Sequence, residues 1–150
     1  MRIILFIIFI MIVSCTVRAQ KISETEVPAE VRSKFTALYP DIKQAEWEKE
    51  GNRYEAGIKV KNSEVSVIFD AEGNLIQTES EISVSDLPQN AKDYCLKKLN
   101  SGNISEASKI ESADGMVTFE AEVNGQDYIF NEKGDFLKKV IEESSEHDAD

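Results

Sequence analysis

The chain has 150 residues, of which 17 are basic and 28 are acidic, giving a formal net charge of −11. Such an acidic chain is poorly suited to binding nucleic acid or anionic membrane surfaces, because that binding depends largely on Lys and Arg neutralising phosphates. The length allows one domain with a modest core.

Residues 1–19 have the pattern of a secretory signal peptide. Arg2 precedes an unbroken apolar run, Ile3 to Val13, which is too short for a permanent membrane anchor. Val17-Arg18-Ala19 then provides a small-x-small cleavage site, which predicts a mature N-terminus at Gln20 and a periplasmic or secreted protein. The alternative is a lipobox ending in Cys15, whose lipidation would make the chain a membrane-anchored lipoprotein.

The first folded segment begins after a polar stretch. Residues 20–26 are predicted to form a flexible lead-in. Pro28 suits the first turn of a helix, where its missing N–H costs nothing. Val31, Phe35 and Leu38 then form one apolar stripe along a short helix that ends before Pro40.

Beyond this helix the pattern changes to an alternation of apolar and polar residues, which predicts strands. Ala45 and Trp47 alternate with glutamates, and the same alternation runs from Tyr54 to Val60. Two more strands follow, through Val65 to Phe69 and from Leu75 to Ile82. The helix and these four strands form a first unit over residues 27–82.

After a linker at residues 83–86, the series is repeated over residues 87–143. Pro28 and Pro88 are sixty residues apart, and the turn glycines Gly73 and Gly134 are sixty-one apart. A repeat of this length is usually one supersecondary unit that needs a neighbour to bury its apolar face.

Cys95 occupies the place in the second helix that Phe35 has in the first. We predict a small buried residue there, with a reactive thiol as the alternative. If the signal peptide is removed, Cys95 is the only cysteine left, so no intramolecular disulfide is expected.

These patterns predict an α+β fold: two tandem α-β4 repeats that form one antiparallel sheet of about eight strands. Both helices are expected on one face, over a core shared by the repeats, because the strands have one apolar and one charged side. Residues 144–150 are acidic and lack large apolar side chains, which predicts a disordered tail.

Several motifs keep a fixed order. The first copy has Tyr39-Pro40, Ala45-x-Trp47-Glu48, Tyr54-Glu55-Ala56, Phe69-Asp70-x-x-Gly73 and Thr78-Glu79-x-Glu81-Ile82, and the second has Leu87-Pro88, Phe119-Glu120-Ala121 and Phe130-Asn131-x-x-Gly134. This order, which covers Val27 to Glu143, resembles the bacterial PepSY-like, β-lactamase-inhibitor-like envelope proteins. The resemblance implies tandem α-β4 repeats with a curved sheet, helices on one side and an open face on the other. It assigns no functional residues, and most members of the family have no known function.

No catalytic constellation, phosphate-binding loop or metal motif is present, so we predict a non-enzymatic protein without a cofactor. The charged side of the strands is instead predicted to be a docking surface for a protein or peptide of the envelope, with plain solvation as the alternative. Its members are Glu46, Glu48, Glu55, Lys59, Lys61, Glu120 and Glu122. A second hypothesis is a periplasmic sensor that binds a small ligand or cation at the seam between the repeats.

Overall fold

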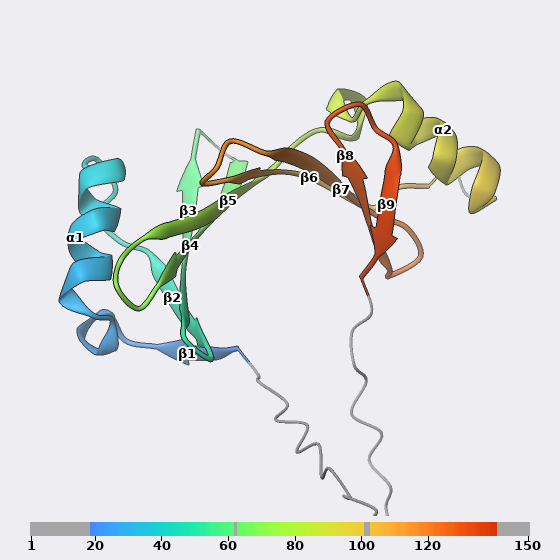
Figure 1. Cartoon of the computed structure of the whole chain (residues 1–150). Coiled ribbons are helices and arrows are strands. Elements are labelled where there is room, and N and C mark those ends of the chain that lie inside the picture. The colour runs from blue at the N-terminus through green and yellow to red at the C-terminus, as the bar shows by residue number, and fades with distance from the viewer. Residues whose placement is uncertain (1–18, 62, 101–102, 141–150) are drawn as a thin grey trace, which may run out of the picture.

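The computed structural model describes residues 19–61, 63–100 and 103–140 (Figure 1). The predicted signal peptide up to residue 18, with Cys15, and the predicted acidic tail lie outside these residues. The secondary-structure elements are β1 (Gln20–Ile22), η1 (Glu24–Glu26), α1 (Ala29–Leu38), β2 (Glu46–Glu50), β3 (Arg53–Val60), β4 (Ser63–Asp70), β5 (Leu75–Glu81), η2 (Val84–Asp86), α2 (Gln89–Lys98), β6 (Glu106–Ser112), β7 (Val117–Glu122), β8 (Asp127–Asn131) and β9 (Phe136–Lys139), where η marks a 3-10 helix.

All nine of these strands join one open sheet in the order of the chain, and each strand is antiparallel to the next. The sheet bends into an arch (Figure 1). The predicted α+β class with one antiparallel sheet is therefore confirmed, with nine strands among the described residues rather than about eight.

The additional strand, β1, lies in the segment predicted to be a flexible lead-in. Gln20, Lys21 and Ile22 pair with β2 at Lys49, Glu48 and Trp47. The lead-in has no alternating apolar pattern, so nothing in its own residues indicated a strand. The unpaired backbone groups along the edge of β2 supply the partner that orders it.

Helix α1 packs on the first strands through a short apolar stripe. Val31 and Phe35 are buried, and the Phe35 ring meets the edge of Trp47 at a centroid distance of 5.3 Å. Leu38, predicted to belong to this stripe, is 44% exposed. The helix ends at Leu38, and Tyr39 packs against Phe35 instead, with ring centroids 5.6 Å apart.

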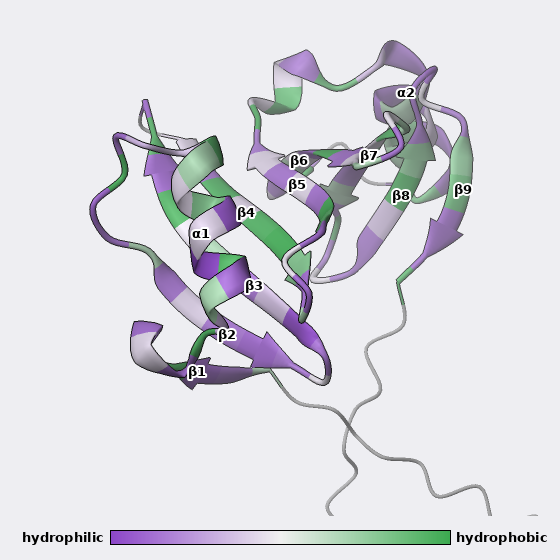
Figure 2. Ribbon diagram, turned by 60° about the vertical axis from the view of Figure 1, so that its left-hand side comes forward, coloured by the Kyte–Doolittle hydropathy of each residue, from purple (hydrophilic) through white to green (hydrophobic). Residues whose placement is uncertain are grey.

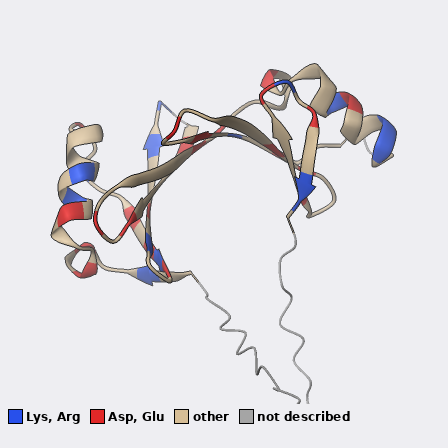
Figure 3. Cartoon of the chain, viewed as in Figure 1, with Lys and Arg blue, Asp and Glu red and all other residues tan. Residues whose placement is uncertain are grey.

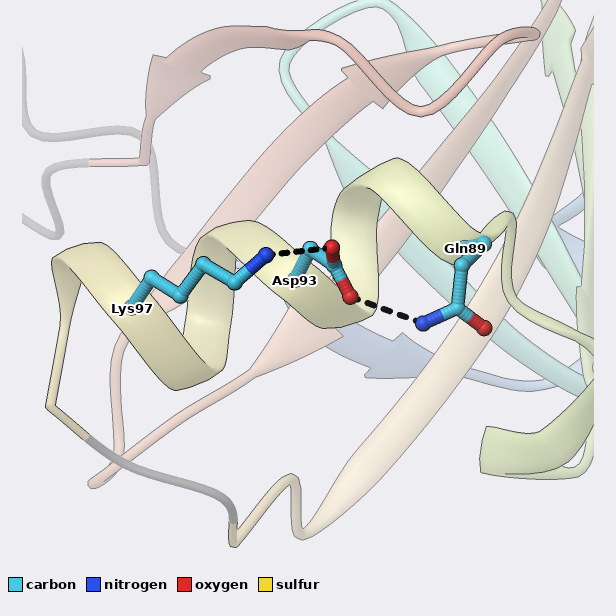
Figure 4. Close-up of polar contacts among 3 residues, drawn as sticks. All are labelled: Gln89, Asp93 and Lys97. Atoms are coloured by element: carbon cyan, nitrogen blue, oxygen red, sulfur yellow. Dashed lines mark hydrogen bonds and ion pairs between the residues drawn. The ribbon is translucent and has the colours of Figure 1, made fainter.

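Helix α2 uses smaller residues on its buried face. Ala91 and Cys95 are fully buried, and the neighbouring Tyr94 stacks on Phe136 of β9 at 4.7 Å. The exposed side of the helix carries a polar chain in which Gln89 Nε2 and Lys97 Nζ each donate a hydrogen bond of 2.7 Å to Asp93 (Figure 4). Such i,i+4 pairs stabilise a helix by a few tenths of a kcal/mol (about 0.2–0.5 each).

The apolar core is divided into two clusters of buried residues, whereas the sequence predicted one shared core. Figure 2 shows apolar positions under each helix. The first cluster contains Val27, Val31, Phe35, Trp47, Tyr54, Ala56, Ile58, Val65, Val67 and Phe69. The second contains Leu87, Ala91, Cys95, Ala107, Ala121, Val123 and Phe130.

Polar residues at the junction of β5 and β6 explain this division. Thr78 pairs with Glu111 and Ser80 with Lys109, on the side of the sheet that carries the core residues. Lys109 also makes an ion pair with Glu111 at 2.9 Å. Because these side chains occupy the junction, the hydrogen-bonded backbone joins the two halves while the apolar packing does not.

The same turn closes β4–β5 and β8–β9. Asp70 Oδ1 accepts hydrogen bonds from the backbone N–H groups of Glu72 and Asn74, at 3.0 and 2.8 Å. Asn131 Oδ1 accepts the equivalent pair from Lys133 and Asp135, both at 2.9 Å. The Asp or Asn of each turn therefore has an ordinary structural role, in which its side chain satisfies backbone N–H groups of the turn.

Candidate functional site

Six of the seven predicted docking residues share one face of the sheet. Directly paired residues of an antiparallel sheet point to the same side, and so do residues two apart along a strand. Glu48 pairs with Glu55, and Lys59 with Glu64. Continuing the register through β4 to β7 brings in Glu120, which pairs with Ser108. The six are Glu46, Glu48, Glu55, Lys59, Glu120 and Glu122, and we call their side of the sheet the polar face.

Lys61 is the exception. Strand β3 ends at Val60, and Lys61 has a positive φ of 50° in the turn that leads to β4. The sequence analysis therefore continued the alternation of β3 one residue too far, to Lys61. The chain reverses after Val60, and alternation alone does not indicate where a strand ends.

The polar face also contains five acidic residues that the sequence analysis missed. They are Glu64, Glu79, Glu81, Glu106 and Asp127. Around Glu79 and Glu81 the alternating residues are Thr78 and Ser80, so no apolar partner indicated which side was covered. Counting outward from the Phe69–Leu75 pair would have placed Glu79 opposite Val65, on the core side. A register shift between Ile68 and Phe69 instead pairs Glu79 with Ser66 and brings both glutamates to the polar face. Figure 3 shows acidic positions recurring along the strands of the arch.

Part of the polar face is hollowed into an open groove of about 1040 Å³ that runs across β2 to β6. Three residues with little or no side chain, Gly57, Ser66 and Ser108, line it between the longer acidic side chains. Its charged lining is one lysine, Lys59, and seven glutamates, which are Glu24, Glu46, Glu55, Glu64, Glu79, Glu81 and Glu106.

Burial, together with repulsion between neighbouring carboxylates, changes the acidity of two glutamates on the polar face. Burial, followed by repulsion from Glu79, Asp127, Glu122 and Glu106, raises the pKa of Glu120 from 4.5 to about 7. Burial is also the main cause that raises the pKa of Glu79, with Glu55 and Asp127 adding repulsion, while a hydrogen bond from Ser108 opposes the shift. Glu79 and Glu120 are therefore harder to ionise than a glutamate in solvent.

Several other glutamates of the polar face accept hydrogen bonds from serines or make ion pairs with lysines. Ser66 Oγ donates to Glu55 Oε1 at 2.5 Å, and Ser105 Oγ donates to Glu122 Oε1 at 2.6 Å. Lys21 pairs with Glu46 at 3.2 Å and Lys59 with Glu64 at 3.3 Å, but these side chains are largely exposed. Such exposed pairs contribute about 0–1 kcal/mol.

At the centre of the polar face there is no such ion pair. Within the described part of the chain, no lysine or arginine nitrogen lies within 4.0 Å of a carboxylate oxygen of Glu79 or Glu120.

The described residues also contain no group of three or more His, Cys, Asp or Glu side chains that could hold a metal ion. None of the helices described is long and apolar enough to cross a bilayer.

Cys95 lies away from the polar face, in the second core cluster. Its side chain is fully buried, and burial raises the pKa of the thiol. The structure therefore supports the predicted packing role, since a protonated and covered thiol is a poor nucleophile.

Comparison with protein families gives a match over residues 12–77, to the family described as "Putative beta-lactamase-inhibitor-like, PepSY-like". The resemblance seen in the sequence is confirmed over this segment. Comparison with curated proteins gives no match.

Solved structures share the fold of a larger part of the chain. A protein described as a putative periplasmic protein from Bacteroides eggerthii DSM 20697 superposes with a TM-score of 0.65 at 13% identity, over 76% of this chain and 88% of that one. A DUF2874 family protein from Bacteroides uniformis ATCC 8492 gives 0.65 at 14% identity, over 75% and 88%. A BLIP-like protein from Bacteroides fragilis NCTC 9343 gives 0.57 at 24% identity, over 75% and 85%. At these identities the likeness establishes the fold alone.

Proposed function

We propose that this chain is a non-enzymatic binding or inhibitory module of the bacterial envelope, which acts on a protein or peptide partner through the polar face. The observation that carries the proposal is the open groove on that face, with its small central residues and its acidic lining. The inhibitor-like description of the matching family and of a similar solved structure supports a binding role. A similar structure described as periplasmic supports the location.

The architecture that we infer for this module is a tandem repeat with both helices on the convex side. The pairs η1–α1 and η2–α2 have equal lengths and begin sixty residues apart. In Figure 1 both helices are drawn outside the arch. The polar face then lines the concave side, where no helix competes with a partner for the groove.

Site-specific photocrosslinking tests the proposal. A photoreactive amino acid would replace Gln77, which lies on β5 in the row of Glu48 and Glu55, or Thr36 on the exposed side of α1. Mature protein carrying either probe would be irradiated in envelope extract. We expect one stoichiometric protein adduct from position 77 and none from position 36. Equal labelling from both positions, or no adduct from position 77, would contradict the proposed binding face.

One observation favours the alternative hypothesis of a small-ligand or cation sensor at the seam. The groove is lined by Glu79 and Glu81 of β5 and by Glu106 and Ser108 of β6, so it crosses the junction between the two halves. A small organic cation would find carboxylates there. Thermal unfolding with and without spermidine or Ca²⁺ tests whether such a cation binds, because a ligand that binds only the folded state raises the melting temperature.

The location follows from how the N-terminus is processed. We propose cleavage after Ala19 and release into the periplasm, with lipidation of Cys15 as the alternative that would anchor the chain to a membrane. Intact mass spectrometry of the protein purified from cells distinguishes them. A mature chain that begins at Gln20 supports release, whereas a diacylglyceryl group on Cys15 would show anchoring.

A further inference from the structure

We infer that the groove on the polar face binds a basic, extended segment of a partner protein, with lysine or arginine side chains seated among the glutamates of β3 to β6. This inference rests on the proposed function and adds the chemistry of the partner. Three properties of the groove carry it: the charge of its lining, its shape and the spacing of its carboxylates.

The charge of the groove selects a cationic partner. Its lining contains seven glutamates and a single lysine. No lysine or arginine among the described residues makes an ion pair with Glu79 near the middle of the groove, and repulsion from Glu55 and Asp127 adds to the burial that raises the pKa of this carboxyl. A partner cation would relieve that repulsion, and complementary charges also accelerate and orient association.

The shape of the groove leaves room for long side chains. Gly57 stands between Glu46 and Ser66 in one row across the sheet, and a Cβ atom on Gly57 would lie no closer than 3.7 Å to any neighbour. The serines at positions 66 and 108 add only a hydroxyl each. Glutamates on either side therefore surround a shallow centre that an aliphatic stem of lysine or arginine can cover.

The spacing of the carboxylates favours an extended segment over a single compact ion. Glu79 and Glu81 are two residues apart on β5, a separation of about 6.8 Å along a strand. Glu55, Glu64 and Glu106 lie on three other strands, β3, β4 and β6. Neighbouring strands of a sheet are about 4.8 Å apart. Alternate residues of an extended peptide repeat at about the same 6.8 Å, so several of its cations can meet successive carboxylates.

The test uses a fluorescent peptide of alternating lysine and valine, and a peptide in which glutamate replaces every lysine. Binding to the mature protein would be followed by fluorescence anisotropy at physiological ionic strength, about 0.15 M. The groove variant is Glu79→Gln with Glu81→Gln. The matched control is Glu72→Gln with Glu132→Gln, which removes the same charge from two turn positions outside the groove.

We expect the lysine peptide to bind the wild type and the control with affinities within about twofold, and the groove variant about tenfold more weakly. The glutamate peptide should not bind any of them. Equal weakening in the groove variant and the control would show that only net charge matters, and would overturn the inference. Absence of lysine-peptide binding would overturn it, as would free spermidine binding as tightly as the peptide.

The crosslinking experiment separates this inference from the proposed function. If position 77 still captures a partner while the lysine peptide does not bind, the binding face stands and the basic chemistry of the partner is wrong. If position 77 captures nothing, the proposed function itself fails.

Discussion

Gly73 packs directly against the carbonyl group of Glu30, so that a Cβ atom at position 73 would lie 2.9 Å from both the carbonyl carbon and oxygen. The turn between β4 and β5 is thus held against the first turn of α1. Gly134 has the same φ of +84° and the same close approach to α2, where a Cβ atom would lie 2.8 Å from Ala91 N. In both halves a glycine allows the turn and the helix to meet.

Replacing Gly73 with Ala should therefore destabilise the protein by about 2–3 kcal/mol, through backbone strain at positive φ and a clash with α1. Gly115→Ala is the matched control, because Gly115 has a similar φ of +86° and a Cβ atom there would meet no other atom within 4 Å. It should cost only about 1 kcal/mol. Urea unfolding measures both, and equal losses would show that the contact with Glu30 contributes nothing.

The acidic face should make stability depend on pH. The pKa of Glu120 is raised to about 7 in the folded state from about 4.5 in the unfolded chain. The folded state therefore binds more protons, and this group's contribution is present below pH 4.5 and is lost as the pH rises through 7. Glu79 has a shift in the same direction. The melting temperature should rise as the pH falls from 8 to about 5.

Glu120→Gln checks this assignment. At pH 8 it should stabilise the fold by about 1–2 kcal/mol, less than the full pKa difference implies because the carboxylate is partly solvated. It should also flatten the rise in melting temperature on acidification. Glu132→Gln, at an exposed turn position, is the control and should leave the pH dependence unchanged. If both variants have identical pH profiles, Glu120 does not hold the shifted proton. Further acidification should destabilise the fold, because hydrogen bonds lower the pKa of Asp70 and of Asp93.

Strand β1 should protect the edge of β2. Deletion of residues 20–23 uncovers backbone groups that Gln20 to Ile22 pair in the intact chain, and exposed strand edges promote association. We expect the shortened protein to oligomerise when studied by size-exclusion chromatography with light scattering. Lys21→Ala is the control, because it removes the ion pair with Glu46 and leaves the backbone pairing intact. A shortened protein that stays monomeric at high concentration would contradict a protective role.

Cutting the chain between Ser83 and Asp86 should leave two halves that do not fold alone. Each core cluster is small for a unit of about sixty residues without a disulfide or metal. The cut also exposes the edges of β5 and β6, which pair from Gln77–Ser112 to Glu81–Ser108. We expect structure by circular dichroism only after the halves are mixed, and one cooperative transition for the intact chain. A half with native-like stability on its own would show two independent domains.

The thiol of Cys95 should react slowly in the native protein. It is fully buried and its pKa is raised by burial, so few thiolates are accessible. Reaction with an aromatic disulfide reagent should be slow in buffer and fast in urea. Rapid native labelling would instead support the alternative of a reactive thiol.

The sequence by itself determined the features that depend on nearby residues. Pro28 and Pro88 mark the helix starts, the alternation around Tyr54 marks a strand, and the turns at Asp70 and Asn131 close on their own backbone N–H groups. These signals are local, because a helix stripe, a strand alternation and an Asx turn each involve a few consecutive residues. They also placed six of the seven predicted docking residues on one face.

Only the tertiary structure decided the features that depend on strand pairing over long distances. The polar segment at Gln20 becomes a strand because β2 presents a free edge, and Thr78 and Glu111 meet at the junction that divides the core. The groove and the shifted acidity of Glu120 likewise depend on the register of the strands, which buries Glu120 and gathers carboxylates from distant parts of the chain around it. Their mutual repulsion depends on distances through space, which the spacing along the sequence does not contain.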